Sequence, residues 1–131
     1  MDHPAIAFLC ARTGFDAPTV ERGVHALRLY AAAAGALTPE ESGLEPAEVA
    51  RARRVYPVYV AELRPGETTP NGRPALCMMG EVTYLRRVAG FTLECALSFV
   101  VAEAYRAGAA QGRYAEVEAG ELAVMLGEQA N

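Results

Sequence analysis

Four polar side chains in and beside an apolar stretch have the types and spacing of a small ligand site. They are separated by seven, four and seven residues, and they are Arg87, Glu94, Ser98 and Tyr105. At about 100° per residue, this spacing places them on one narrow stripe of a helix. On that stripe, Glu94 could act as an acid or base and Arg87 could hold an anion, while the two hydroxyls orient a ligand. The same pattern also fits the solvated side of a mostly buried helix, which is the interpretation that we favour.

Other catalytic chemistry finds little support in the sequence. All twelve basic residues are arginines, so lysine nucleophiles and phosphate-loop lysines are excluded. The only histidines, His3 and His25, belong to no metal-binding motif, and we expect neither a metal nor a cofactor. Three widely spaced cysteines, Cys10, Cys77 and Cys95, indicate reduced thiols rather than disulfides.

A short basic cluster is the one candidate nucleic-acid site. Its members are Arg51, Arg53 and Arg54. Glu45 and Glu48 lie close by in sequence, and the whole chain has a net charge of −4, so phosphates would be repelled. We therefore keep an Arg-dependent nucleic-acid regulator only as an alternative function.

The apolar stretch over residues 90–105 is not expected to span a membrane. It is too short for a span and contains Glu94 and Glu103, each costing about 2.5 kcal/mol or more near the bilayer centre. The N-terminus has Asp2 where a secretory signal would be basic, and its apolar run ends at Arg12. Together with the reduced cysteines, this predicts a cytoplasmic location without a membrane partner.

Length and composition predict one globular domain over residues 1–131. The chain is 52% apolar and 21% charged, as expected for a folded protein with a sizeable core. The only linker-like segment is RPGETTPNGRP, residues 64–74, with three prolines and two glycines. It divides the chain into two halves, and we expect these halves to pack together because neither is large enough alone.

Local signals predict three helical segments in the first half. Asp16 is a plausible N-cap for a helix over about 17–35, whose apolar residues recur at helical spacing. Thr38 and Glu41 form a capping-box pattern for a short turn that Gly43 would end. Pro46 can open the next helix, which an apolar stripe would continue to about residue 63.

Pro57 disturbs that last helix and leaves two structures open. Inside a helix, proline loses one hydrogen bond and costs about 3 kcal/mol unless the helix kinks. Alternatively, the helix ends near Arg54, and the segment VYPVYVAEL forms a strand that pairs with ALCMMGEVTYL as a hairpin, 55–63 with 75–85. We favour the kinked helix.

In the second half, we expect helices through MMGEVTYLRR, through the stretch that follows Gly90 and stops at Gly108, and over about 113–127. The predicted fold is therefore all-α, a compact bundle of four to six helices with the loop at 64–74. The hairpin would make it α+β instead.

The prediction of function depends on the apolar pattern of residues 91–102. Apolar side chains cover more than the usual third of that helix, which indicates a helix surrounded by others or packed against a second copy. We expect a non-enzymatic regulatory or assembly protein that forms a homodimer through residues 91–102 and the final helix. The alternative is a small-molecule binder or simple acid–base enzyme that uses a cleft at Glu94.

Overall fold

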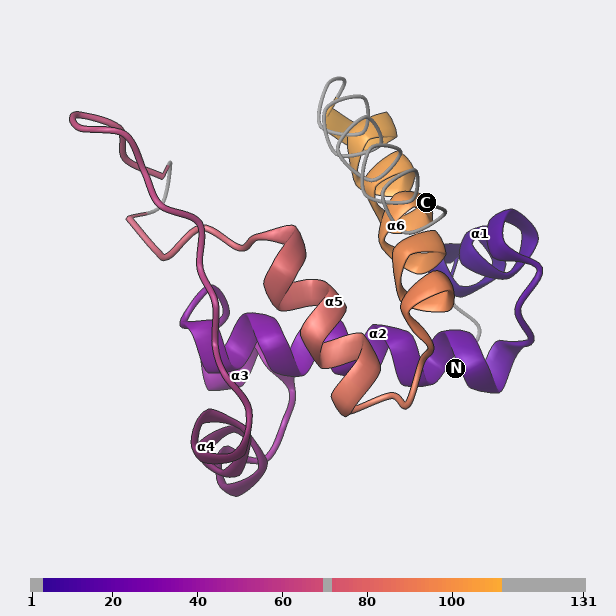
Figure 1. Ribbon diagram of the computed structural model, residues 1–131, viewed down its shortest axis with the longest axis horizontal. Coiled ribbons are helices and arrows are strands. Elements are labelled where there is room, and N and C mark those ends of the chain that lie inside the picture. The colour runs from indigo at the N-terminus through magenta and orange to yellow at the C-terminus, as the bar shows by residue number, and fades with distance from the viewer. Residues whose placement is uncertain (1–3, 70–71, 112–131) are drawn as a thin grey trace. The chain divides into compact units, whose positions relative to one another are not determined.

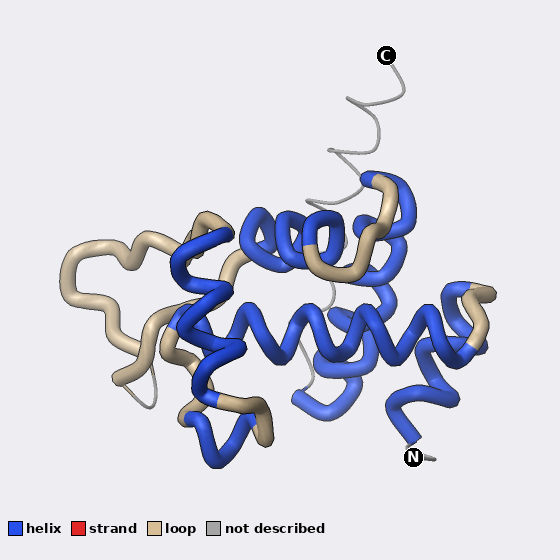
Figure 2. Tube along the Cα trace, turned by 90° about the horizontal axis from the view of Figure 1, so that it is seen from below, coloured by secondary structure: helices blue, strands red, loops and turns tan. Residues whose placement is uncertain are grey.

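The computed structural model describes residues 4–69 and 72–111, with side chains up to residue 107. This part of the chain contains six helices, and Figure 2 shows helices joined by loops without a strand. The helices are α1 (Pro4–Thr13), α2 (Ala17–Ala34), α3 (Pro39–Ser42), α4 (Pro46–Val55), α5 (Met78–Arg87) and α6 (Leu93–Gln111). The prediction of an all-α fold with four to six helices is confirmed. The helix expected over 113–127 lies outside the described residues.

The chain forms two compact units, and each has its own buried side chains. Unit 1 comprises residues 1–23 and 91–131, and unit 2 comprises residues 24–90. The Pro/Gly loop was expected to divide the chain into two halves, but residues 64–74 lie within unit 2. In the sequence, the unit boundaries fall inside α2, after Gly23, and at Gly90.

Local capping signals place α2 and α3 where the sequence predicts them. The Asp16 carboxylate accepts a hydrogen bond from the Thr19 amide at 2.9 Å, so Asp16 is the N-cap of α2. At α3, the Thr38 hydroxyl accepts from the Glu41 amide, and the Glu41 side chain accepts from the Thr38 amide, which completes the capping box. Gly43 ends this helix with a φ of 67°, in the left-handed region that favours glycine.

The favoured kinked helix over 46–63 is wrong, because α4 ends at Val55. Tyr56 adopts an extended conformation, with φ −115° and ψ 142°, as the residue before a proline prefers. The hairpin alternative is wrong as well, since α5 occupies residues 78–87, where the second strand was expected. Between α4 and α5, residues 56–69 and 72–77 are not helical, and we call the segment that joins these two helices the arm (Figure 1).

Unit 1 buries the apolar side of α6 against α1 and the first turns of α2. Helix α1, which the sequence analysis did not predict, packs against α6. Phe91 contacts both Phe15 and Phe99 edge to face, with ring centroids 6.0 and 5.6 Å apart. Phe99 also lies against Gly23, where an added Cβ would come within 2.6 Å of the ring. Helix α1 and Gly23 of α2 therefore cover part of the apolar circumference of α6.

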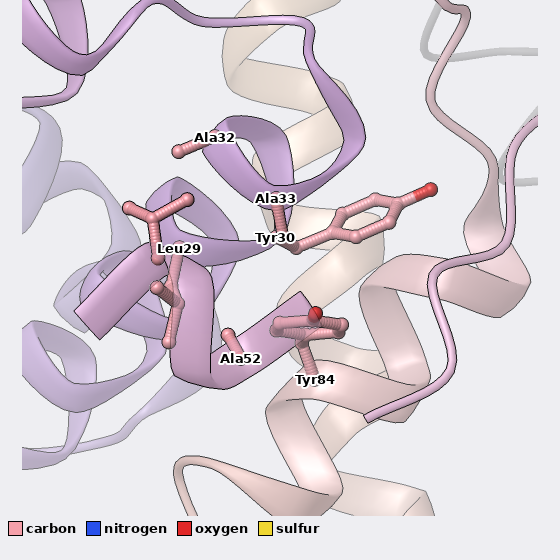
Figure 3. Close-up of a cluster of buried hydrophobic side chains, with 7 residues drawn as sticks. Leu29, Tyr30, Ala32, Ala33, Ala52 and Tyr84 are labelled. Carbon is pink, nitrogen blue, oxygen red and sulfur yellow. The ribbon is translucent and has the colours of Figure 1, made fainter. Parts of the chain in front are cut away.

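Unit 2 is built around buried tyrosines and small residues of α2, α4 and α5. The cluster consists of Leu29, Tyr30, Ala32, Ala33, Val49, Ala52 and Tyr84 (Figure 3). The Tyr30 ring lies directly over α5 at Gly80, where a Cβ would fall 2.1 Å from the Tyr30 hydroxyl oxygen. Glycine at position 80 is therefore what allows the ring to approach the helix this closely.

Candidate functional site

The four residues of the proposed polar stripe do not share one helix. Glu94, Ser98 and Tyr105 lie on α6 and are exposed to solvent. Arg87 is the last residue of α5, and residues 88–92 between the two helices are not helical. Gly90 takes a φ of 74° there, and Thr92 accepts a hydrogen bond from the Cys95 amide near the start of α6.

Two of the polar groups of α6 already have partners within unit 1. The Arg12 guanidinium lies 4.2 Å from the centre of the Tyr105 ring, a cation–π contact that joins α1 to α6. Glu103 pairs with Arg106 on the next turn of the same helix. Glu94, with its exposed side chain, matches the solvated side of a buried helix.

The apolar residues of α6 that were expected to form a dimer seam are buried in the single chain. Leu97, Phe99 and Val100 are almost fully buried, and so is Phe91 just before the helix. They are therefore not available to a second copy, and this part of the dimer prediction loses its structural basis. The other part of the expected seam, the final helix, lies outside the described residues.

The arginine cluster of α4 is partly used for structure. The Arg53 guanidinium donates hydrogen bonds to the carbonyls of Ala33 at 2.9 Å and Ala32 at 3.1 Å. These carbonyls belong to the last turn of α2, where a positive charge also stabilises the negative end of the helix. Arg51 and Arg54 are exposed.

His25 and the cysteines form no larger reactive group. His25 Nε2 lies 2.8 Å from a Glu48 carboxylate oxygen, and both side chains are roughly 40% exposed. Cys10, Cys77 and Cys95 are free thiols of intermediate exposure. Within residues 4–69 and 72–111, no three His, Cys, Asp or Glu side chains gather closely enough to hold a metal ion.

The arm is the feature of unit 2 that exposes large apolar side chains. Eight such side chains are exposed in the described part of the chain, and six of them belong to the arm or to the residues next to it. They are Val55, Tyr59, Val60, Leu63, Leu76 and Met79, exposed by 39 to 62%. The other two, Phe8 and Tyr105, belong to unit 1. We call the set of six the arm side chains.

The two sides of the arm are joined by a backbone hydrogen bond. The Ala61 amide donates to the Ala75 carbonyl at 2.9 Å. If this bond were continued as an antiparallel ladder, the next hydrogen-bonded pair would be Tyr59 with Cys77. At this position, the Tyr30 hydroxyl lies between the two residues and bridges them. It accepts a hydrogen bond from the Cys77 amide at 3.1 Å and donates one to the Tyr59 carbonyl at 2.5 Å.

This inserted hydroxyl fixes the base of the arm to α2. Figure 3 shows the Tyr30 hydroxyl pointing away from the apolar cluster to which its ring belongs. Burial raises the pKa of Tyr30 above its ordinary value, so the hydroxyl keeps the proton that it donates to Tyr59. Tyr30 thereby holds together segments that are 29 and 47 residues away in the sequence.

A second tyrosine supports the same region by packing alone. The ring of Tyr84 lies 5.2 Å from that of Tyr30 and 5.5 Å from that of Tyr56, measured between centroids. Its hydroxyl is buried and has no hydrogen-bond partner within the described residues. The cluster therefore positions the start of the arm, at the expense of one unsatisfied polar atom.

Sequence reasoning missed the arm side chains as a surface. The signal was present in the β-branched and aromatic run around Pro57, but the helical stripe drawn through Tyr56, Tyr59 and Leu63 placed these residues in a core. Proline at 57 decides against that stripe, because it shifts Tyr56 out of the helical region.

The chain matches no known family model, no curated protein and no solved structure. No helix within the described ranges is both long enough and apolar enough to cross a lipid bilayer.

Proposed function

We propose that this protein acts by binding protein chains rather than by catalysis, and that it self-associates through the arm side chains. The observation that carries the proposal is the concentration of exposed large apolar residues in and beside the arm. The proposal keeps the homodimer expected from the sequence but moves its surface from residues 91–102 to unit 2. An assembly or regulatory role follows from such binding.

The amount of exposed apolar surface supports this role. With roughly 150 to 200 Å² for each large side chain when fully exposed, the six exposed fractions correspond to about 500 Å². Apolar patches of roughly 300 to 600 Å² are the largest on typical monomers and are often functional. Two copies that covered these side chains would bury about 1,000 Å² in total, close to the lower limit for a specific interface.

The composition of the arm also favours binding over solvation. From Val55 to Ala61 no residue is charged, and Glu62 is the first charge that follows α4. Natural proteins protect exposed extended segments with charges or proline, and residues 56–61 of the arm carry no charge and one proline, Pro57. No comparable observation favours a ligand site at Glu94, which is exposed on α6.

Light scattering on matched variants tests the proposal. Leu76 in the arm and Phe8 in α1 are both 39% exposed, so each can be replaced by aspartate at equal exposure. We expect wild-type protein at tens of micromolar to have twice the mass of one chain, Leu76→Asp to have the mass of one chain, and Phe8→Asp to remain a dimer. Loss of the dimer in both variants, or in neither, would contradict a surface located in the arm.

A further inference from the structure

The backbone of the arm has one bonded side and one free side. In an extended chain, the N–H and C=O groups of alternate residues point to opposite edges. Tyr59 and Ala61 use the inner edge, since the Tyr59 carbonyl accepts from Tyr30 and the Ala61 amide donates to Ala75. The outer edge therefore belongs to Val58, Val60 and Glu62, whose backbone amides have no hydrogen-bond partner among the described residues.

We propose that two copies of the chain pair their arms as antiparallel strands along this outer edge, with Val60 of one copy opposite Val60 of the other. The inference rests on the proposed self-association through the arm and adds its mode. An isologous pair of this kind lets the same edge satisfy itself across a twofold axis. Each of the three pairs, Val60 with Val60 and Val58 with Glu62 in both directions, would exchange two hydrogen bonds.

Hydrogen bonds already present in unit 2 select this register. If the register were shifted by two residues toward α4, Tyr56 of one copy would lie opposite Glu62 of the other. The Tyr56 amide, however, already donates to the Ala52 carbonyl. If the register were shifted by two residues away from α4, Arg64 of one copy would lie opposite Val58 of the other. The Arg64 amide, however, already donates to the Glu67 carboxylate at 2.8 Å. With Val60 at the centre, all three free positions are used and no existing bond is broken.

Charge and proline placement fit the same arrangement. Glu62 would lie opposite Val58, so the two copies bring no like charges directly together, whereas a register centred on residue 62 would oppose two carboxylates. Pro57 lacks an amide N–H, but its position alternates with that of Val58, so the missing donor falls on the inner edge. The outer edge keeps every donor that the pairing needs.

The apolar area that strand pairing would cover also agrees with a second copy of the chain as the binding partner. Strand pairing would cover the exposed side chains of Tyr59, Val60 and Leu63 from both copies. The remaining arm side chains are Val55 in α4, Leu76 just before α5 and Met79 in α5, and covering all six in both copies would bury about 1,000 Å². Backbone hydrogen bonds would supply the directional part of the interaction.

A proline substitution tests the strand pairing. Val60→Pro removes the central outward N–H, which has no partner among the described residues, and an extended residue tolerates proline. Val60→Thr is the matched control, because it keeps the N–H and a β-branched side chain. We expect the dissociation constant of the dimer to rise on the order of thirtyfold in Val60→Pro, which loses two donors per dimer, and to change little in Val60→Thr.

The outcomes separate this inference from the proposed function. A wild-type dimer that Val60→Pro leaves intact would overturn strand pairing while self-association through side chains stands. Equal weakening by Val60→Thr would also overturn it. A wild-type chain that stays monomeric overturns both proposals. Hydrogen exchange of the wild-type protein gives a readout without substitution, because the amides of Val58, Val60 and Glu62 should exchange more slowly at high concentration than after dilution. Equal exchange at both concentrations contradicts the pairing.

Discussion

Gly80→Ala is the substitution for which the structure predicts an effect opposite to the usual one. Alanine in place of glycine within a helix normally stabilises it by about 1 kcal/mol. At position 80, however, the new Cβ would lie 2.1 Å from the Tyr30 hydroxyl oxygen and 2.2 and 2.4 Å from two ring carbons. Ordinary contacts at a Cβ begin at 3.4 Å, so the ring must move by more than 1 Å.

The environment of Tyr30 determines how much that movement costs. The side chain is fully buried, and its hydroxyl bonds to the Tyr59 carbonyl and the Cys77 amide. Overpacking in a core costs about 1 to 3 kcal/mol, and weakening two hydrogen bonds adds about 1 kcal/mol each. After the gain in helix propensity is subtracted, we expect Gly80→Ala to destabilise the protein by about 2 to 4 kcal/mol.

Urea unfolding, followed by circular dichroism, measures this difference. The midpoint should fall while the slope stays the same, since the unfolded chain exposes the same surface. The matched control is the same substitution in a Tyr30→Leu background, which removes the ring atoms that clash. There, alanine at position 80 should be neutral or stabilising. A Gly80→Ala protein as stable as the wild type, in the presence of Tyr30, would refute the close approach of this ring to α5.

Three further predictions concern the groups around the arm and α2. Tyr84→Phe should stabilise the protein by about 0.5 to 1.5 kcal/mol in thermal unfolding, because it removes a buried hydroxyl that has no partner in the described part of the chain; a loss of stability would indicate that the hydroxyl is bonded. Arg53→Lys should cost about 1 kcal/mol, because an ammonium group does not reproduce the two hydrogen bonds of the guanidinium to the Ala32 and Ala33 carbonyls; Arg54→Lys, also at an exposed position of α4, is its control and should be neutral. Burial raises the pKa of Tyr30 above 10.0, so the folded chain keeps a proton that the unfolded chain releases near that value. The free energy of unfolding should therefore fall as the pH rises above about 10, and Tyr30→Phe should flatten that dependence.

Signals that act within a few residues were predicted well. The helix expected over 17–35 is observed as Ala17–Ala34, with Asp16 at its N-cap. The capping box at Thr38 and the helix that opens at Pro46 are also found. These features depend on the backbone conformation and side chains of one turn, so the sequence contains all that decides them.

Features decided by contacts distant in the sequence were not predictable in this way. The Tyr30 hydroxyl bonds to a carbonyl 29 residues away, and Arg53 caps a helix 20 residues before it. The broad apolar circumference of α6 was assigned to a second copy because α1 was not predicted as its neighbour. The single helix assumed for the polar stripe was wrong for a local reason, since Gly90 and Thr92 separate Arg87 in α5 from Glu94 in α6.

The mass of the wild-type protein as a function of concentration tests the central claim, self-association through the arm, most directly. Sedimentation equilibrium from nanomolar to tens of micromolar protein should show a transition from one chain to two, with no larger species at the upper end. A mass that stays at one chain over the whole range would contradict the account.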